Sequence, residues 1–212
     1  MRIGTIELDK PLALAPMEDV TDVSFRLICK ELGVDLLYTE FASSAALVRD
    51  VASTVRKIRV TDFERPIAVQ IFGGVEEPMD EAARVAEEAC PDFIDVNCGC
   101  WVRKVVRRES GAGLLKNLNK FEAVVRAVLS GTKLPVTVKT RIGWDQDNIV
   151  ILDVARMVEQ LGVQALSVHC RTRSQGHSGP AEWSWLTKLK ETVSIPIIGN
   201  GDVNSPEDVK RM

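Results

Sequence analysis

Short apolar runs alternate along the chain with longer stretches of helical periodicity, and this alternation predicts the fold. Most of the runs are apolar at successive positions and rich in β-branched residues, as expected for parallel strands that are covered on both faces. The seven runs are LALAPM (12–17), LLYTEF (36–41), PIAVQIF (66–72), FIDVNC (93–98), PVTVKTR (135–141), ALSVHCR (165–171) and PIIGNG (196–201).

The stretches between these runs carry the signals of helix ends. Gly33, Gly131 and Gly162 each close a periodic stretch, as glycine does after a helix C-terminus. Ser205 and Pro206 supply an N-cap and a first helical residue. The predicted helices lie within 20–33, 76–89, 119–131, 147–162 and 205–212.

Repeated strand–helix units spaced by about 24–40 residues predict a (β/α)8 TIM barrel, an α/β fold, rather than a doubly wound sheet. No G-x-G-x-x-G motif follows the first run, which weakens the Rossmann alternative. Seven strands are visible, and residue 212 lies inside the seventh helix. We therefore expect residues 1–212 to form one barrel domain that is truncated after its seventh strand.

The composition is that of an ordinary globular domain, with 45% hydrophobic and 27% charged residues among 212. No long uncharged apolar stretch and no signal-peptide pattern is present, so we expect a cytoplasmic protein without a membrane span. Five scattered cysteines indicate reduced thiols rather than a disulfide framework. A net charge of −3 argues against a wholly basic nucleic-acid binder but leaves room for a local basic patch.

Polar residues follow the predicted strands at their C-terminal ends, where parallel barrels carry their active sites. Against the apolar strand bodies, this repetition predicts a ligand-lined mouth. The residues are Pro16 and Met17, Glu40, Gln70, Asn97 with Cys98 and Cys100, Lys139 with Arg141, His169 with Arg171, and Asn200, Gly201 and Asp202.

The residue types at this mouth limit the kinds of ligand that it can bind. Lysine, amide and histidine side chains supply donors with little acidic charge for a metal, which suits an electron-rich heterocycle bearing a phosphate. The GNGD turn at 199–202, followed by the helix that starts at Ser205, predicts a phosphate seat.

Longer motifs in a fixed order then connect the chain to a known family. They are LAPMEDVTDVSFR (14–26), TEF (39–41), VQIFGG (69–74), DVNCGC with its basic tail (95–108), SGAGLL (110–115), VKTRIGWD (138–145), HCRTRSQGHSGPAEW (169–183) and GNGD (199–202). With these motifs the chain resembles the bacterial tRNA-dihydrouridine synthases, most closely their B-type branch.

The resemblance implies an FMN-dependent oxidoreductase that reduces the C5=C6 bond of selected tRNA uridines, with NADPH as reductant. It implies flavin contacts at Ala15, Pro16, Met17, Gln70, Lys139 and His169, with Asn200, Gly201 and Asp202 holding ribityl and phosphate groups. Lys139 would face the ring edge where negative charge collects on reduction. Asn97 and Arg141 would line the uracil pocket.

Cys100 aligns with the family's catalytic cysteine. A thiol of ordinary pKa is mostly protonated at neutral pH, so it can deliver the proton that C5 needs after hydride reaches C6. The segment 100–113, with three nearby glycines, has the composition of a mobile loop. Trp101 stands where the family usually has proline, and the family's helical tRNA-binding domain lies outside this chain.

Basic residues beside the thiol suggest contacts to an RNA backbone. These are Arg103, Lys104, Arg107 and Arg108 after Cys100, together with Arg171 and Arg173. His177, in the same loop as Arg173, is either an exposed loop residue or a further contact. The four tryptophans are either packing residues or a stacking surface for bases.

Several alternatives stay open. A metal site built from Cys98, Cys100, Cys170 and His169 is disfavoured by its C-x-C spacing, so we expect no metal. The other functional readings are an FMN barrel acting on a free pyrimidine, of the dihydroorotate dehydrogenase type, and an inactive barrel fragment. The sequence indicates no oligomeric state and does not identify the target uridine.

Overall fold

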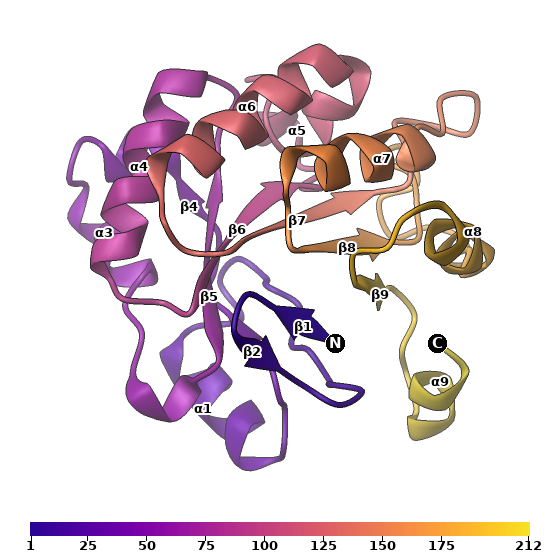
Figure 1. Ribbon diagram of the computed structural model, residues 1–212, viewed down its shortest axis with the longest axis horizontal. Coiled ribbons are helices and arrows are strands. Elements are labelled where there is room, and N and C mark those ends of the chain that lie inside the picture. Colours follow the sequence, from indigo (N-terminus) through magenta and orange to yellow (C-terminus); the bar gives the residue numbers. More distant parts are fainter.

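A curled, parallel sheet forms the centre of the computed structural model, which describes residues 1–212 (Figure 1). Its strands pair in the order β3-β5-β6-β7-β8-β9, with the short β4 also on β5, and every pairing is parallel. No strand pairs β9 with β3, so the sheet follows part of a barrel and stays open. The strands are β3 (Leu37–Tyr38), β4 (Ala42–Ser43), β5 (Ile67–Phe72), β6 (Phe93–Cys98), β7 (Val136–Arg141), β8 (Ala165–His169) and β9 (Ile197–Asn200).

Helices cover the outer face of this sheet (Figure 1). They are α1 (Val23–Glu31), α2 (Ser44–Leu47), α3 (Ala52–Lys57), α4 (Glu76–Glu88), α5 (Arg103–Val106), α6 (Leu118–Gly131), α7 (Ile151–Leu161), α8 (Ser184–Thr192) and α9 (Pro206–Arg211), with 3-10 turns η1 (Asp62–Glu64) and η2 (Gly111–Lys116). None of these helices has the length and apolar character needed to cross a lipid bilayer.

Side chains along each central strand alternate between two environments. In β6, Ile94, Val96 and Cys98 join the large core between the sheet and its helices, and this core explains why the strand bodies are so apolar. Phe93 points the other way, into a smaller cluster inside the curl, and the residues of its parity include Asp95 and Asn97. The inner face of the sheet therefore changes from apolar to polar toward the C-terminal strand ends.

An N-terminal hairpin, β1 (Arg2–Ile3) and β2 (Ile6–Glu7), lies inside the curl of the sheet (Figure 1). Ile3 is fully buried there with Tyr38 and Phe93, whose rings meet edge to face at 5.8 Å. The hairpin thereby seals the apolar end of the curl and leaves the polar strand ends at the opposite, open end.

The barrel class and six of the seven predicted strands are confirmed. The segment 12–17 was wrongly predicted as a full strand, because it contributes only a parallel bridge between Ala13 and Leu36. With β3 as its sole neighbour and a proline that lacks an N–H at position 16, this segment cannot extend a ladder.

The predicted helices form, but their glycines act in two ways. Gly33 and Gly162 have φ values of +95° and +90°, as residues that end a helix in the left-handed region do. Gly131 instead is the last residue of α6, and a β-carbon there would lie 2.3 Å from the carbonyl oxygen of Asp80. Its role is to let α6 approach α4 closely. Ser205 caps α9 as predicted, accepting the N–H of Asp208.

Candidate active site

The C-terminal strand ends bring most of the predicted site residues to one place. The parallel register sets Asn97 beside Lys139, and it aligns Arg141, His169 and Asn200 across three strands. All of these residues have inward parity, so they form a polar mouth at the open end of the curl.

A chain of amide hydrogen bonds runs from β5 to Cys100. The Gln70 amide donates to Asp95 at 2.6 Å, and the Asn97 amide donates to Gln70 Oε1 at 2.9 Å. Asn97 Oδ1 in turn accepts the backbone N–H groups of Gly99 at 3.1 Å and Cys100 at 2.9 Å. Buried polar side chains thus fix where the strand ends and where the Cys100 segment begins.

Asp95 is a site residue that the sequence reading missed. It is fully buried, and Thr137 and Gln70 both donate to its carboxylate. Burial raises its pKa, while these hydrogen bonds and the Lys139 charge oppose that rise. The signal was available, since Asp95 precedes Asn97 by two positions in a strand and therefore shares its face.

Lys139 is a half-buried cation without a carboxylate within ion-pair distance. Its Nζ donates to Asn200 Oδ1 at 3.1 Å, which uses one of three donors. Burial, aided by the neighbouring Arg141 charge, lowers the pKa of Lys139 to about 8, against the attraction of Asp95. The side chain therefore carries an incompletely compensated charge at the mouth.

Arg141 ties together backbone segments around the mouth. Its guanidinium donates from Nε to the carbonyl of Gly99 at 3.1 Å, and from Nη1 to the carbonyls of Thr172 at 3.0 Å and Gly176 at 2.8 Å. Burial and the nearby Arg171 charge lower its pKa to about 10. Only Nη2 makes no hydrogen bond within the chain, so that edge is the one left for a ligand.

The Cys100 thiol is half-buried beside these cations. Burial raises its pKa, and the charges of Arg141 and Lys139 oppose the rise only in part. The thiol is consequently protonated at neutral pH and able to donate a proton. All five cysteines are free, and Cys98 points away from the mouth into the outer core.

His169 is neutral at physiological pH. Burial and the surrounding cations lower its pKa to about 3. Arg171 Nη1 lies 3.3 Å from His169 Nε2, and because a guanidinium only donates, the imidazole accepts there and keeps its proton on Nδ1. Nε2 of the neutral His169 ring thus accepts from Arg171, and Nδ1–H is the one hydrogen-bond donor of the ring.

The Asp202 carboxylate forms an ion pair with Arg171, so it is not free to bind a ligand in the mouth. Its two oxygens accept from Arg171 Nη2 at 2.6 and 2.8 Å, and one also accepts the N–H of Ala181 at 2.7 Å. Gly201 has φ +109°, and a β-carbon there would lie 3.0 Å from Ala181 and 3.2 Å from His169. These residues shape the mouth by close backbone approach.

The predicted phosphate seat at the start of α9 is not supported by this geometry. The Asp208 carboxylate already accepts from the backbone of Asn204 at 3.1 Å and from the Ser205 hydroxyl at 2.9 Å. The Asp208 carboxylate thus already binds the donors at the N-terminus of α9 and supplies the negative charge there, so it takes the place of a bound phosphate.

The segment after Cys100, predicted as a mobile loop, forms α5 and η2. Residues 110–115 are buried, whereas residues 101–104 and 107–109 are exposed. A β-carbon at Gly111, whose φ is +55°, would lie 2.8 Å from the Cys100 carbonyl oxygen. One at Gly113 would lie 3.0 Å from the carbonyl oxygen of Val106. These glycines allow close packing of the buried part, and the mobility of the exposed part stays a prediction.

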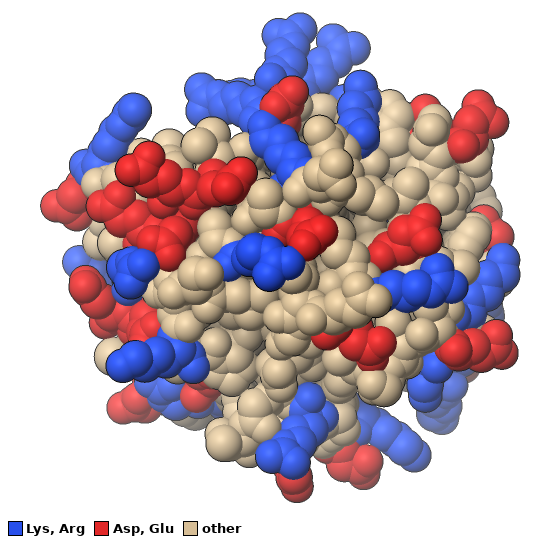
Figure 2. Space-filling view, turned by 45° about the horizontal axis from the view of Figure 1, so that its top comes forward, with Lys and Arg blue, Asp and Glu red and all other residues tan.

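Exposed cations follow the thiol along the chain. Arg103, Lys104, Arg107 and Arg108 are all exposed, and none of them forms an ion pair. In Figure 2, Lys and Arg side chains project at the top of the view and a group of Asp and Glu side chains lies at its left, while both signs are mixed over the rest of this face. Arg103 and Lys104 are the first two residues of α5, three and four positions after Cys100.

A second basic group surrounds Trp144. Lys116 Nζ lies 4.0 Å and the Arg173 guanidinium carbon 4.6 Å from the centre of its ring, both within cation–π range. Neither cation has a carboxylate partner. Arg173 thus packs on Trp144 outside the row of mouth residues.

The segment 15–17 lies next to β3 at the same end of the sheet. Ala15 and Pro16 are half-buried, and the Thr21 hydroxyl holds Met17 through its backbone N–H at 3.0 Å and its carbonyl at 3.1 Å. Met17 is 52% exposed, so its side chain is available at the rim.

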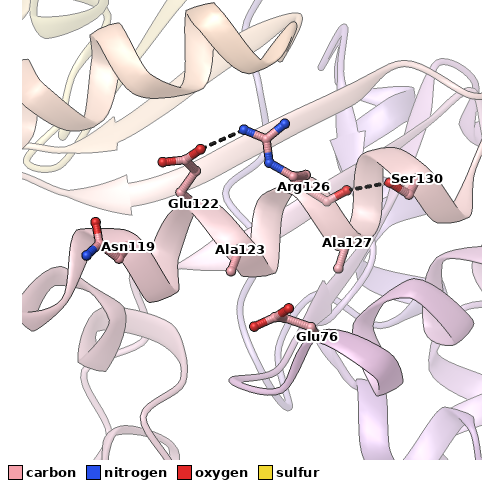
Figure 3. A pocket seen from close by; sticks show the side chains of 7 residues that line it. All are labelled: Glu76, Asn119, Glu122, Ala123, Arg126, Ala127 and Ser130. Carbon is pink, nitrogen blue, oxygen red and sulfur yellow. Dashed lines mark hydrogen bonds and ion pairs between the residues drawn. The ribbon is translucent and has the colours of Figure 1, made fainter.

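A shallow depression on the outside of α4 and α6 does not have the features of a catalytic site. It is lined by Glu76 and by six residues of α6, and the charged pair among them, Glu122 and Arg126, bonds to itself at 2.6 Å (Figure 3). No buried titratable group faces it. The polar mouth is therefore the candidate active site.

An open curl of parallel strands, capped outside by helices and polar at its strand ends, defines a barrel-type enzyme fold. The comparison with solved structures agrees on the fold alone. An old yellow enzyme homologue from Zymomonas mobilis superposes with a TM-score of 0.64 at 12% identity, over 96% of this chain and 81% of that one.

The family follows from the sequence comparisons. The family model described as Dihydrouridine synthase (Dus) matches residues 13–212, and the chain belongs to this family. It is 41% identical, over all of its length, to the tRNA-dihydrouridine synthase B of Pseudomonas syringae pv. tomato. It is 36% identical, over 95% of its length, to a probable tRNA-dihydrouridine synthase of Rhizobium leguminosarum bv. phaseoli. The chain spans 63% of the length of each of these two relatives.

Proposed function

We propose that this chain is the catalytic barrel of an enzyme that reduces the C5=C6 bond of uridines in tRNA to dihydrouridine, with FMN as cofactor and NADPH as reductant. Family membership supports the reaction class. The observation that carries the assignment to the mouth is the arrangement of the protonated Cys100 thiol beside two cations without carboxylate partners, Lys139 and Arg141.

The residues at the mouth fit a flavin. Lys139 retains two unused donors, and its lowered pKa reflects a charge that an electron-rich ring edge would stabilise. Gln70 and Asn97 offer amide edges, and His169 offers a neutral ring. Asn200 and Gly201 would lie along the ribityl chain, and the segment 15–17 would contact the isoalloxazine from the other side.

FMN held by these residues would supply, after its reduction by NADPH, the hydride for C6 of the uracil. The chain's own task is then to deliver one proton to C5. The Cys100 Sγ–H bond breaks, a C5–H bond forms, and the electron pair left on sulfur makes a thiolate that takes its next proton from solvent. The half-buried position of Cys100 allows both steps.

Two features favour a uridine within RNA over a free pyrimidine. The exposed cations Arg103, Lys104, Arg107 and Arg108 adjoin the thiol and have no carboxylate partners, which suits a polyanionic backbone. Lys116 and Arg173 on Trp144 are two further cations without carboxylate partners, which adds to the positive charge available to a polyanion. A uridine bound in this way would have to leave its stack to reach the mouth.

The test incubates the protein with FMN, NADPH and tRNA that lacks dihydrouridine, and nucleoside mass spectrometry measures the product. Dihydrouridine in the tRNA is the expected result. Reduction of free uridine or free uracil alone would replace the proposal by a pyrimidine-reducing barrel, while a colourless protein that binds no FMN would support the inactive-fragment alternative.

A further inference from the structure

Trp101, the residue directly after Cys100, packs against another loop through the six-membered ring of its indole. A β-carbon at Gly176 would be 3.2, 3.3 and 3.5 Å from three carbons of the Trp101 ring, so the indole rests on the glycine backbone. The His177 ring meets the indole edge to face at 5.5 Å, and lies 6.2 Å from the His169 ring. The indole therefore joins the Cys100 segment to the loop 173–179.

Arg141 joins the same two segments from inside the mouth. Its Nε donates to the carbonyl of Gly99, directly before Cys100, and its Nη1 donates to the carbonyl of Gly176. Cys100 thus stands between two attachments to one loop, a polar one at residue 99 and an aromatic one at residue 101. The backbone N–H of Cys100 donates to Asn97 Oδ1, which holds the backbone that carries the thiol.

We propose that Trp101 is a positioning residue, which docks the Cys100 segment on the loop 173–179 and limits the access of solvent to the thiol. Without the indole, Cys100 keeps its backbone attachments, which include the N–H of Ala112 on its carbonyl at 3.0 Å, but no side chain after it would hold the exposed residues 101–104 against Gly176. The docking of Trp101 on the loop 173–179 is independent of the proposed function. Its use, to position Cys100 for proton delivery to a substrate, rests on the proposed function.

Alkylation of the cysteines by iodoacetamide, assigned to each cysteine by fragmenting the peptides in the mass spectrometer, tests the docking without any assay of activity. Assignment by residue is needed because Cys90, Cys98 and Cys100 lie in one stretch without Lys or Arg, residues 85–102. In Trp101→Ala the Cys100 rate should rise by on the order of tenfold, because local opening exposes the thiol. Trp101→Phe, which keeps a ring over Gly176, should restore most of the protection. His177→Ala removes the edge partner and should give a smaller rise.

The chain supplies its own controls. Cys90 is exposed and lies before the N-terminal end of β6, at the opposite end of the strand from Cys100, so its rate reports reagent activity, whereas buried Cys98 and Cys170 report unfolding. Val102→Ala trims the exposed neighbour in the same segment and should leave the Cys100 rate unchanged.

Two outcomes overturn the proposal. One is a Cys100 rate in Trp101→Ala equal to that of the unchanged protein. The other is a parallel rise at Cys98 and Cys170, which would make Trp101 a residue of general stability. A selective rise at Cys100 in a protein that makes no dihydrouridine would keep the docking and reject the proposed function.

Discussion

Asn97 Oδ1 accepts the backbone N–H of Cys100 at 2.9 Å, so the last inward residue of β6 fixes the first residue of the segment that carries the thiol. The same Asn97 amide is held by Gln70 at 2.9 Å. Side chains of two neighbouring strands, β5 and β6, consequently hold the backbone at Cys100 in place.

Replacing Cys100 by Ala should abolish dihydrouridine formation while FMN still binds and is still reduced by NADPH. The variant removes the proton donor and leaves the cations and amides in place. Rapid-mixing absorbance at the flavin bands separates the two half-reactions. Cys98→Ala is the matched control, since Cys98 faces the outer core, and should keep full activity with at most a modest loss of stability. Full activity in Cys100→Ala would remove this thiol from the mechanism.

FMN affinity should weaken as pH rises through about 8, the lowered pKa of Lys139. Below that pH the ammonium is charged and attracts the electron-rich ring edge, and above it the free protein holds a neutral amine that must take up a proton on binding. Fluorescence titration of FMN across this range measures the effect. Lys139→Arg should flatten the profile and Lys139→Met should weaken binding at every pH. An unchanged profile in Lys139→Met would contradict the assignment.

Gly111→Ala should accelerate the alkylation of Cys100, because its β-carbon would lie 2.8 Å from the Cys100 carbonyl oxygen and push the segment outward. Gly33→Ala is the matched control. Both glycines have positive φ, so both variants should lose about 1 kcal/mol of folding free energy. Gly33 has no atom within 4 Å of the new carbon, so the Cys100 rate should stay unchanged there. Equal rates in the two variants would argue against close packing as the role of Gly111.

Glu64→Ala should destabilise the fold by about 3–5 kcal/mol, since it leaves a buried arginine without its carboxylate. Arg26 and Glu64 are 1% and 0% exposed and meet at 2.6 Å, tying α1 to η1. Urea denaturation followed by circular dichroism gives the value. The exposed pair of Arg126 and Glu122 meets at the same distance, and Glu122→Ala should change stability by only about 0.5 kcal/mol. Similar losses in both variants would mean that burial is not the deciding factor.

The double variant Arg103→Ala/Lys104→Ala should weaken tRNA binding and reduce the salt dependence of the binding constant, with a slope lower by about 1–2. Filter binding across a salt series measures this slope. Arg84→Ala/Arg126→Ala removes the same charge from cations that are paired with Asp80 and Glu122, and should leave the slope unchanged. Equal effects in both double variants would indicate a non-specific dependence on net charge.

The sequence predicts the central strands better than it predicts the contacts of the site residues. The β6 bounds, Phe93–Cys98, coincide with the predicted run because every second residue, Ile94, Val96 and Cys98, packs into the helix-covered core. Segment 12–17 has equally apolar residues, yet pairs only at Ala13, because strand formation depends on partners as well as on side chains.

In the site, too, some features could be predicted from the sequence and others could not. Position near the C-terminal strand ends grouped Gln70, Asn97 and Lys139 in the prediction, and the alternation of side chains along β6 would have added Asp95. What Arg141 binds was beyond the sequence, since its acceptors are backbone carbonyls of loops 31, 35 and 42 residues away. The docking of Trp101 on Gly176 is likewise a contact between loops, which neither composition nor periodicity encodes.

The spread of the Arg141 acceptors along the chain also orders events during synthesis. The Gly99 carbonyl is already made when residue 141 emerges, but the Gly176 carbonyl follows 35 residues later. At ribosomal rates this interval lasts about 2–7 seconds. The strands β3 to β7 precede this interval, whereas the attachment of Arg141 to Gly176 cannot form until its end. A nascent chain therefore passes through a stage in which five strands of the sheet and Cys100 are made and the loop that covers the Cys100 segment is not.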